Sequence, residues 1–240
     1  MDSNILSTIP LFSSLKNDLL EEIASSLAIR NYPRDQIIFH QGDPGSTLYI
    51  ITSGQVKITM ISPHGEEVLL AILTENECFG ELAIFDGEER SATATAMTPT
   101  ETVCLQQDPF LDILFKHPEM VRDILAVLCK RLRQADAFVQ DTIFMNVRSR
   151  LAKRLIQLSH QHGIETEHGI VIGLNITQQD IADNIGASRV AVNKELGILQ
   201  DTDIIHINRK QITILLRQLP HILPISCIQN RQTTTNFLIQ

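Results

Sequence analysis

Apolar residues recur at alternating intervals of four and three near the middle of the chain, and this repeat limits the possible folds most strongly. The residues in the repeat are Val121, Leu125, Leu128, Leu132, Ala135, Val139 and Thr142. Three heptads of this kind predict one long helix, roughly Pro118 to Met145, with a narrow apolar seam. Packing of this helix on its own domain is the alternative, but the length of the seam favours a parallel homodimer.

Short β-type runs separated by turn residues occupy the chain from Pro33 to Leu105, before this helix. The clearest runs are Gln36–Phe39, Leu48–Ile51, Val56–Thr59 and Val68–Leu70. Many short strands at regular intervals are typical of a compact all-β barrel or roll. The first part of the chain is therefore predicted to be a β-domain that leads into the long helix.

Two short helices joined by a tight turn are predicted near the C-terminus. Thr177 and Asp180 form a capping-box pattern at the start of the first helix, and Gly186 supplies the turn. Ser188 caps the second helix, which runs to about Leu199. The residues expected to face inward are Ile181, Ala182, Ile185, Val192 and Leu196. This is the pattern of a helix-turn-helix, whose second helix enters the major groove of DNA.

Two strand-like runs, Ile204–Ile207 and Ile212–Leu215, follow these helices and flank a basic tip. This predicts a hairpin, the wing of a winged helix, whose basic residues suit phosphate contacts. On the second helix, Arg189 can bind guanine O6 and N7, while Val190 can touch a thymine methyl group. The candidate DNA-contacting residues are Gln178, Ser188, Arg189, Val190, Asn193, Lys194, Arg209 and Lys210.

The charge distribution agrees with DNA binding by the second half of the chain alone. The net charge is −8 over 240 residues. Residues 1–146 carry 10 basic and 21 acidic residues, whereas residues 147–219 carry 9 and 7. The first part is therefore strongly acidic, and only the second part suits an approach to phosphates.

Several other function classes have no support in the sequence. The longest apolar run, Val68–Leu73, is far shorter than the ~20 residues of a membrane span, and residues 1–4 do not resemble a signal peptide. The four cysteines are far apart, so no metal site is expected. No nucleophile–base–acid set is evident. We expect a cytoplasmic protein with no membrane partner that is not an enzyme.

A second informative stretch, Phe79–Ala92, combines a glycine turn, a carboxylate and an arginine. Gly80 can leave backbone N–H groups free, and the Arg90 guanidinium can bind a phosphodiester. Glu81, nine residues before the arginine, can accept a hydrogen bond from a ribose hydroxyl. A simple Glu81–Arg90 salt bridge is the structural alternative, but it leaves the glycine turn unexplained.

This stretch resembles the phosphate-binding cassette of cyclic-nucleotide-binding domains. Together with the long helix and the helix-turn-helix, residues 11–218 resemble the CRP/FNR superfamily of bacterial transcription regulators. The resemblance implies an α+β fold with a jelly-roll-like β-roll over residues 11–115 and a dimerisation helix over 116–145. A winged helix-turn-helix over 146–218 and a tail over 219–240 follow.

The resemblance also implies roles for individual residues. Glu81 would bind the ribose 2′-hydroxyl, and Arg90 and Ser91 would bind the cyclic phosphate together with the Gly80 backbone. Alignment through Arg131 places Ala135 and Asp136 where the family contacts the base. The candidate ligand-binding residues are Gly80, Glu81, Leu82, Arg90, Ser91, Ala135 and Asp136.

The effector implied first is cyclic AMP, but the base position leaves alternatives open. Asp136 can accept from the adenine amino group, or from guanine N1–H and N2–H together. The alternatives are therefore a guanine cyclic nucleotide, or regulation without a ligand. The implied partners are a second copy of the chain, DNA with two-fold-related half-sites, and RNA polymerase.

The recognition helix departs from the common family pattern and is similar to that of cyanobacterial nitrogen-control regulators. The similarity lies in Ser188–Val192, and Glu195 occupies a position that is usually apolar or small. A cyclic-nucleotide-binding module that acts on a protein partner is the competing class. It accounts for the cassette but leaves the turn and the wing unexplained.

Overall fold

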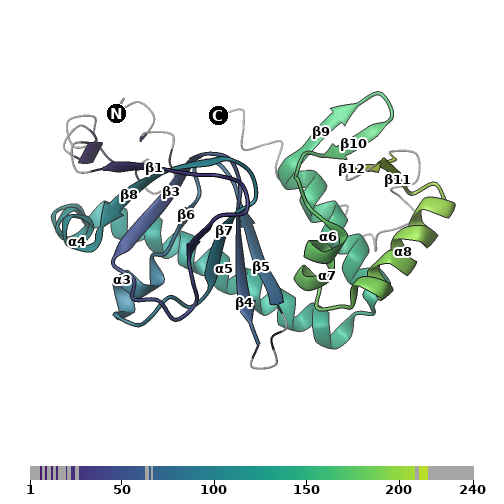
Figure 1. Ribbon diagram of the computed structural model, residues 1–240, viewed down its shortest axis with the longest axis horizontal. Helices are drawn as coiled ribbons and strands as arrows, with labels where there is room; N and C mark the ends of the chain where they lie inside the picture. The colour runs from purple at the N-terminus through teal and green to yellow at the C-terminus, as the bar shows by residue number, and fades with distance from the viewer. Residues whose placement is uncertain are drawn as a thin grey trace. The chain divides into compact units, whose positions relative to one another are not determined.

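The computed structural model describes Leu6, Ile9, Phe12, Leu15, Leu20, Ile23, Ala24, residues 27–62, Gly65, and residues 67–208 and 211–215. The chain forms two compact units, residues 1–140 and 141–240 (Figure 1). The division falls inside the long helix, whereas the sequence-based boundaries gave that helix a segment of its own.

The first unit contains a β-roll of two antiparallel four-stranded sheets within the described residues. One sheet has the order β1 (Ala28–Tyr32), β8 (Thr100–Gln106), β3 (Thr47–Ser53) and β6 (Cys78–Phe79). The other has the order β2 (Ile37–Phe39), β7 (Thr93–Ala96), β4 (Val56–Ile61) and β5 (Glu67–Leu73). The four strands predicted from the sequence are confirmed as β2, β3, β4 and β5.

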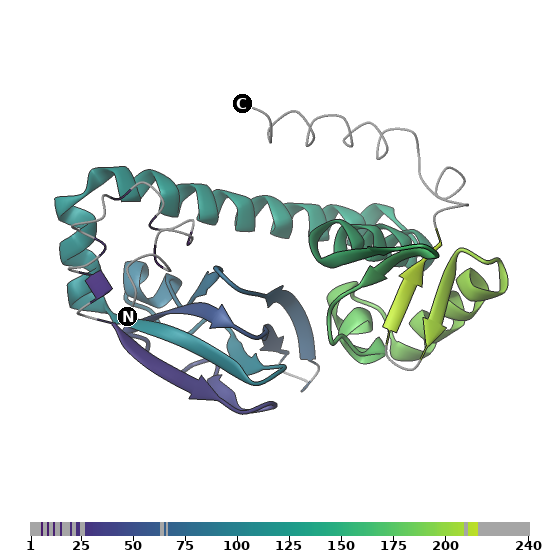
Figure 2. The ribbon, with the colours of Figure 1, turned by 90° about the horizontal axis from the view of Figure 1, so that it is seen from above.

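Alternating side chains of β3 belong to two separate cores. Leu48 and Ile50 pack in the cluster that includes the helices, whereas Tyr49 and Ile51 belong to the cluster shared by both sheets. The helices are α3 (Leu82–Asp86), α4 (Gln107–Lys116) and α5 (Pro118–Phe144). Figure 2 shows α5 running alongside the roll, against which Met120 and Ile124 are buried.

The predicted seam of α5 is mostly exposed in a single chain. Leu125, Leu132 and Val139 are 53%, 63% and 55% exposed, and Ala135 and Thr142 are exposed as well. Leu128 differs because it is partly buried against the core of the roll. The helix therefore carries two apolar stripes, one packed on its own roll and one along the seam. The homodimer itself stays a prediction.

The second unit places three helices on a small antiparallel sheet. Its helices are α6 (Val147–His162), α7 (Gln178–Asn184) and α8 (Arg189–Asp201). The sheet has the order β11 (Ile205–Asn208), β12 (Gln211–Ile214), β10 (Gly169–Ile172) and β9 (Gly163–Thr166). The predicted helix-turn-helix and hairpin are confirmed, whereas β9 was not predicted.

Local capping fixes the helix starts of this unit. The Thr177 hydroxyl accepts from the Asp180 N–H, and the Asp180 carboxylate accepts from the Thr177 N–H, which completes the predicted capping box. The Ser188 side chain accepts from the Ala191 N–H at 3.2 Å. Gly186, with φ of +62°, makes the turn between α7 and α8. All the residues predicted to face inward are buried.

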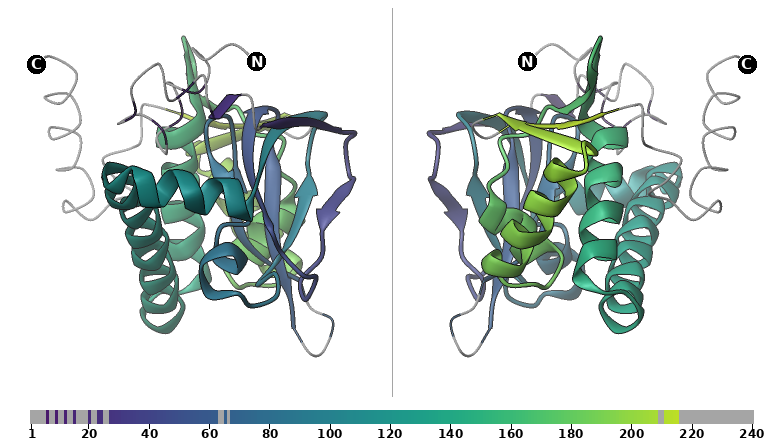
Figure 3. Two further views of the ribbon diagram at one scale, coloured as in Figure 1. Left: turned by 90° about the vertical axis from the view of Figure 1, so that its left-hand side faces the viewer. Right: turned by 90° about the vertical axis from the view of Figure 1, so that its right-hand side faces the viewer.

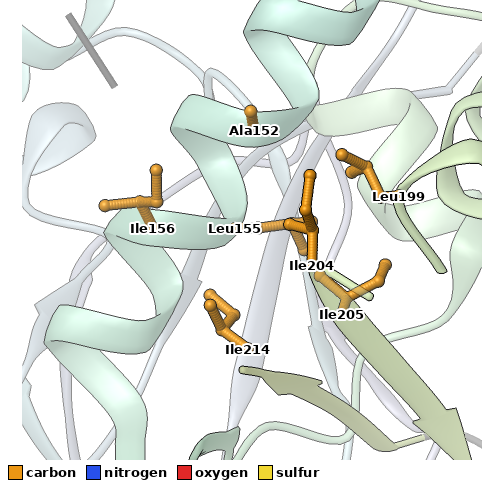
Figure 4. A pocket seen from close by; sticks show the side chains of 7 residues that line it. All are labelled: Ala152, Leu155, Ile156, Leu199, Ile204, Ile205 and Ile214. Atoms are coloured by element: carbon orange, nitrogen blue, oxygen red, sulfur yellow. The ribbon is translucent and has the colours of Figure 1, made fainter. Parts of the chain in front are cut away.

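A shallow apolar depression lies where α6, α8, β11 and β12 meet (Figure 4). It is lined by Ala152, Leu155, Ile156, Leu199, Ile204, Ile205 and Ile214. These side chains offer only aliphatic carbon, so the depression suits packing rather than a polar ligand.

In the described part of the chain, no helix combines the length and apolar character that crossing a bilayer requires.

Candidate ligand pocket and nucleic-acid interface

Arg90 is buried between the two sheets of the roll although it carries a positive charge. Its side chain is held by two backbone carbonyls that lie far apart in sequence. Nη1 donates to the Gly80 oxygen at 2.6 Å, and Nη2 donates to the Thr47 oxygen at 2.9 Å. The residue is only 5% exposed, and Nε has no hydrogen-bond partner among the described residues. Arg90 is therefore fixed in position without a carboxylate ion pair within the described chain.

Aromatic rings form one wall around this guanidinium. Its central carbon lies 4.4 Å from the centroid of Phe39 and 5.7 Å from that of Tyr49. Tyr49 stacks on Phe79 with ring centroids 5.0 Å apart. Burial lowers the pKa of Arg90, and the nearby Tyr49 and Glu81 oppose that shift. An arginine remains protonated at neutral pH even when its pKa is lowered.

Two glycines leave the space that the Arg90 side chain occupies. A Cβ atom at Gly45 would lie 2.6 Å from Arg90 Nε, and one at Gly80 would lie 2.5 Å from Arg90 Nη1. Gly80 also has φ of +82°, a conformation that other residues rarely adopt. The glycine turn at Gly80, predicted from the sequence, thus has a second function, because it lets the arginine lie against the backbone.

Glu81 is buried, and only one of its two carboxylate oxygens has a hydrogen-bond partner among the described residues. Its Oε1 accepts from Arg131 Nη1 on α5, and Arg131 Nη2 donates to the Cys78 carbonyl. Its Oε2 is buried without a hydrogen-bond partner among the described residues. The ion pair of Glu81 is therefore with Arg131, and the alternative of a Glu81–Arg90 salt bridge is wrong.

Sequence reasoning used Arg131 only to align the long helix and did not identify it as part of the pocket. A signal was present, because Arg131 is a basic residue directly beside the apolar seam.

Burial raises the pKa of the neighbouring Cys78 thiol to about 11. That thiol is neutral at pH 7, so it adds no charge beside Glu81.

The structure brings Gly80, Glu81 and Arg90 together and leaves the other predicted ligand-binding residues on the surface. Leu82 is 41% exposed, and Ser91 is exposed at the start of the segment leading into β7. Ala135 and Asp136 are also exposed and lie about one turn beyond Arg131 on α5. A buried cation, a buried carboxylate oxygen and an exposed helix face thus make up the candidate pocket.

The predicted DNA-contacting residues of α8 form an exposed face opposite its buried side. Arg189, Asn193 and Lys194 are exposed, and Val190 is 79% exposed. Gln178 is half-buried at the start of α7. This face offers a guanidinium, an amide, an ammonium group and an apolar tip, which are the groups that read base edges.

The tip of the hairpin lies outside the described residues. Arg209 and Lys210, predicted to contact phosphates, fall between β11 and β12 in this segment. The strands themselves pair over Ile205–Ile214 and His206–Thr213, and Figure 3 shows the hairpin next to α8. Glu195, unusual for its position, is paired with Arg148.

Comparison with known families identifies both parts of the chain. Residues 29–117 match the cyclic nucleotide-binding domain, and residues 149–219 match the Crp-like helix-turn-helix domain. These two ranges contain the cassette of Gly80, Glu81 and Arg90, and the helices α7 and α8.

Similar proteins match this chain over most of its length. The CRP-like cAMP-activated global transcriptional regulator of Mycobacterium tuberculosis is 34% identical over 210 residues, which cover 88% of this chain and 94% of the relative. The global nitrogen regulator of Synechococcus elongatus is 33% identical over 190 residues, covering 78% and 86%. Among solved structures, the c-di-GMP responsive global regulator CLP of Xanthomonas campestris has a TM-score of 0.74 at 24% identity, covering 83% of this chain and 99% of CLP.

Proposed function

Because the chain belongs to the CRP/FNR superfamily of DNA-binding transcription regulators, we propose that it is a homodimer whose DNA binding is controlled by a cyclic nucleotide. Cyclic AMP is the first candidate effector. The proposed dimer binds two-fold-related half-sites, with one recognition helix in each major groove, and contacts RNA polymerase at the promoter.

The incomplete bonding of Arg90 and Glu81 is the observation that carries this proposal. Arg90 is a buried cation without a carboxylate ion pair, and Glu81 Oε2 is a buried acceptor without a donor, within the described residues. A cyclic nucleotide supplies both missing partners, since its phosphate is anionic and its ribose 2′-hydroxyl is a donor. Ser91 and the Gly80 backbone complete the proposed phosphate contacts.

Heptad geometry supports a contact from the partner helix to the base. Arg131 precedes the seam residue Leu132, and Asp136 follows the seam residue Ala135, so they occupy positions g and e. In a parallel two-stranded coil, position g of one helix faces position e of the other. Since Arg131 contacts the pocket through Glu81, the partner subunit's Asp136 would approach the same pocket.

A guanine cyclic nucleotide is the second candidate, and Asp136 is the observation that favours it. An exposed carboxylate can accept two hydrogen bonds from guanine, through N1–H and N2–H, whereas from adenine it can accept only from the amino group. In support of cyclic AMP, the Mycobacterium tuberculosis relative is described as cAMP-activated. The two effectors would shift the same equilibrium, each by its difference in affinity for the two dimer states.

Titration calorimetry with cyclic AMP and cyclic GMP on the full chain tests the effector. We expect cyclic AMP to bind more tightly, and Asp136→Ala to weaken the preferred nucleotide about tenfold, since a hydrogen bond to a carboxylate is lost. Gln134→Ala, another exposed change on α5, is the control and should bind like the wild type. Binding of neither nucleotide at micromolar concentrations would refute cyclic-nucleotide control.

Gly45→Val should damage the pocket without removing any predicted ligand contact. The Cβ of the new side chain would lie only 2.6 Å from Arg90 Nε and force the guanidinium to move, so we expect at least about tenfold weaker nucleotide binding by calorimetry. Gly197→Ala is the control, because a Cβ there meets nothing within 4 Å among the described residues. Unchanged affinity in Gly45→Val would show that the Arg90 position does not matter for binding.

A further inference from the structure

An ion pair joins the first turn of α6 to the flank of the recognition helix. Arg148 Nε donates to Glu195 Oε2 at 2.6 Å. The Glu195 side chain is only 17% exposed, whereas the Arg148 side chain is 56% exposed. The carboxylate therefore lies mostly within the protein, and much of the arginine remains accessible to solvent.

The contact uses only one edge of the guanidinium. An arginine has five N–H donors arranged in a rigid plane, and one of them, Nε–H, is bound to Glu195. Within the described residues, Arg148 has no other hydrogen bond or ion pair. The pair of Nη atoms is consequently left as an unused fork, and such a fork matches the geometry of a phosphate.

The other arginine and lysine side chains of α6 are already bound or buried. Arg150 donates to the Gly186 carbonyl at 3.3 Å, and Lys153 pairs with Asp141 at 2.7 Å. Burial lowers the pKa of Arg154. Among the arginines and the lysine of this helix, Arg148 is thus the one that is held by an ion pair and still has unbound N–H donors within the described residues.

The position of Glu195 places Arg148 beside the groove-facing side of α8. Val192, Leu196 and Leu199 are the buried residues of this helix, and Glu195 lies at the border between them and solvent. At 100° per residue, it lies on the flank away from Arg189 and Asn193. A helix in the major groove has a phosphate backbone along each flank, so this flank also faces phosphates.

We propose that Arg148 binds a backbone phosphate of the DNA through its two Nη atoms while Glu195 holds Nε. Arg148 is then a DNA-binding residue outside the helix-turn-helix, and Glu195 is its positioning residue. The inference rests on the proposed function, since it requires α8 to enter the major groove. It also explains an acid on a DNA-binding helix, because the arginine covers the carboxylate and neutralises it.

The salt dependence of DNA binding tests the phosphate contact. The probe is a duplex enriched from a random-sequence pool by the full-length wild type in the presence of cyclic AMP, and binding is measured by fluorescence anisotropy. We expect Arg148→Ala to weaken binding about tenfold per subunit and to reduce the slope of log K against log salt by about 0.9 per subunit. Arg148→Lys should retain the slope, because the charge remains.

Arg34→Ala is the matched control, since Arg34 is an exposed arginine of the first unit that also pairs with a carboxylate. It should leave both the affinity and the slope unchanged. An Arg148→Ala slope equal to that of the wild type would overturn the phosphate contact. Failure of the wild type to bind any duplex would instead refute the proposed function, so the two failures are distinguishable.

The positioning role is tested by repeating Arg148→Ala in two Glu195 backgrounds. Glu195→Gln keeps an acceptor for Nε but removes the charge, whereas Glu195→Leu removes both. We expect Arg148→Ala to cost about tenfold per subunit in the first background and about threefold or less in the second. Equal losses in the two backgrounds would overturn the positioning role.

Discussion

Arg90→Leu is expected to weaken cyclic nucleotide binding by more than about a hundredfold and to abolish any response of DNA binding to the ligand. The substitution removes the buried cation that the phosphate would meet, and leaving one charge of a buried pair without its partner costs about 3–5 kcal/mol. Calorimetry measures the affinity, and anisotropy with and without nucleotide at fixed salt measures the response.

Controls separate this loss from a loss of folding. Arg90 also donates to the Gly80 and Thr47 carbonyls, so thermal unfolding of the variant must be followed by circular dichroism. Arg90→Lys keeps the charge but loses the paired N–H donors of the guanidinium, so this variant should bind the nucleotide with intermediate affinity. Arg34→Leu, on the surface, should behave like the wild type. A fully folded Arg90→Leu protein that still responds to nucleotide would contradict the assigned pocket.

Leu132→Asp is expected to dissociate the proposed dimer. Leu132 is 63% exposed in a single chain, and burial in a seam stabilises such a side chain by about 1.5–3 kcal/mol. A dimer carries the change twice and also brings two carboxylates into an apolar seam. The dimer Kd should rise by more than about a thousandfold. Sedimentation velocity measures the association state.

DNA binding should fall together with dimerisation. A monomer holds only one half-site, so the loss of the second binding unit should reduce affinity at least about a hundredfold. Gln134→Asp adds the same charge at an exposed position outside the seam and should remain dimeric. A dimeric Leu132→Asp protein would show that the seam is not the dimer interface.

Elements set by local chemistry could be predicted from the sequence. The start of α7 depends on Thr177 and Asp180, three residues apart, and the start of α8 depends on Ser188. The turn between them needs a positive φ, which Gly186 provides. Each of these interactions joins residues only a few positions apart, so the sequence alone predicts the helix-turn-helix almost residue by residue.

Contacts between distant segments could not be predicted in the same way. Arg131 and Glu81 are 50 residues apart, and Arg148 and Glu195 are 47 apart. Neither residue of a pair indicates its partner until the fold brings the two together. The cassette motif groups Glu81 with Arg90, yet it does not show that α5 supplies the ion pair of the carboxylate.

Glu81 Oε2, which has no hydrogen-bond partner among the described residues, also has a consequence for stability. A buried acceptor without a donor lowers the free energy of unfolding of the ligand-free protein, and a bound ribose hydroxyl would remove that penalty. Selection for stability alone would replace this carboxylate with an apolar side chain of similar size. Under the proposed function, the ligand-free protein is therefore less stable than its fold allows, and binding of the nucleotide would relieve this deficit.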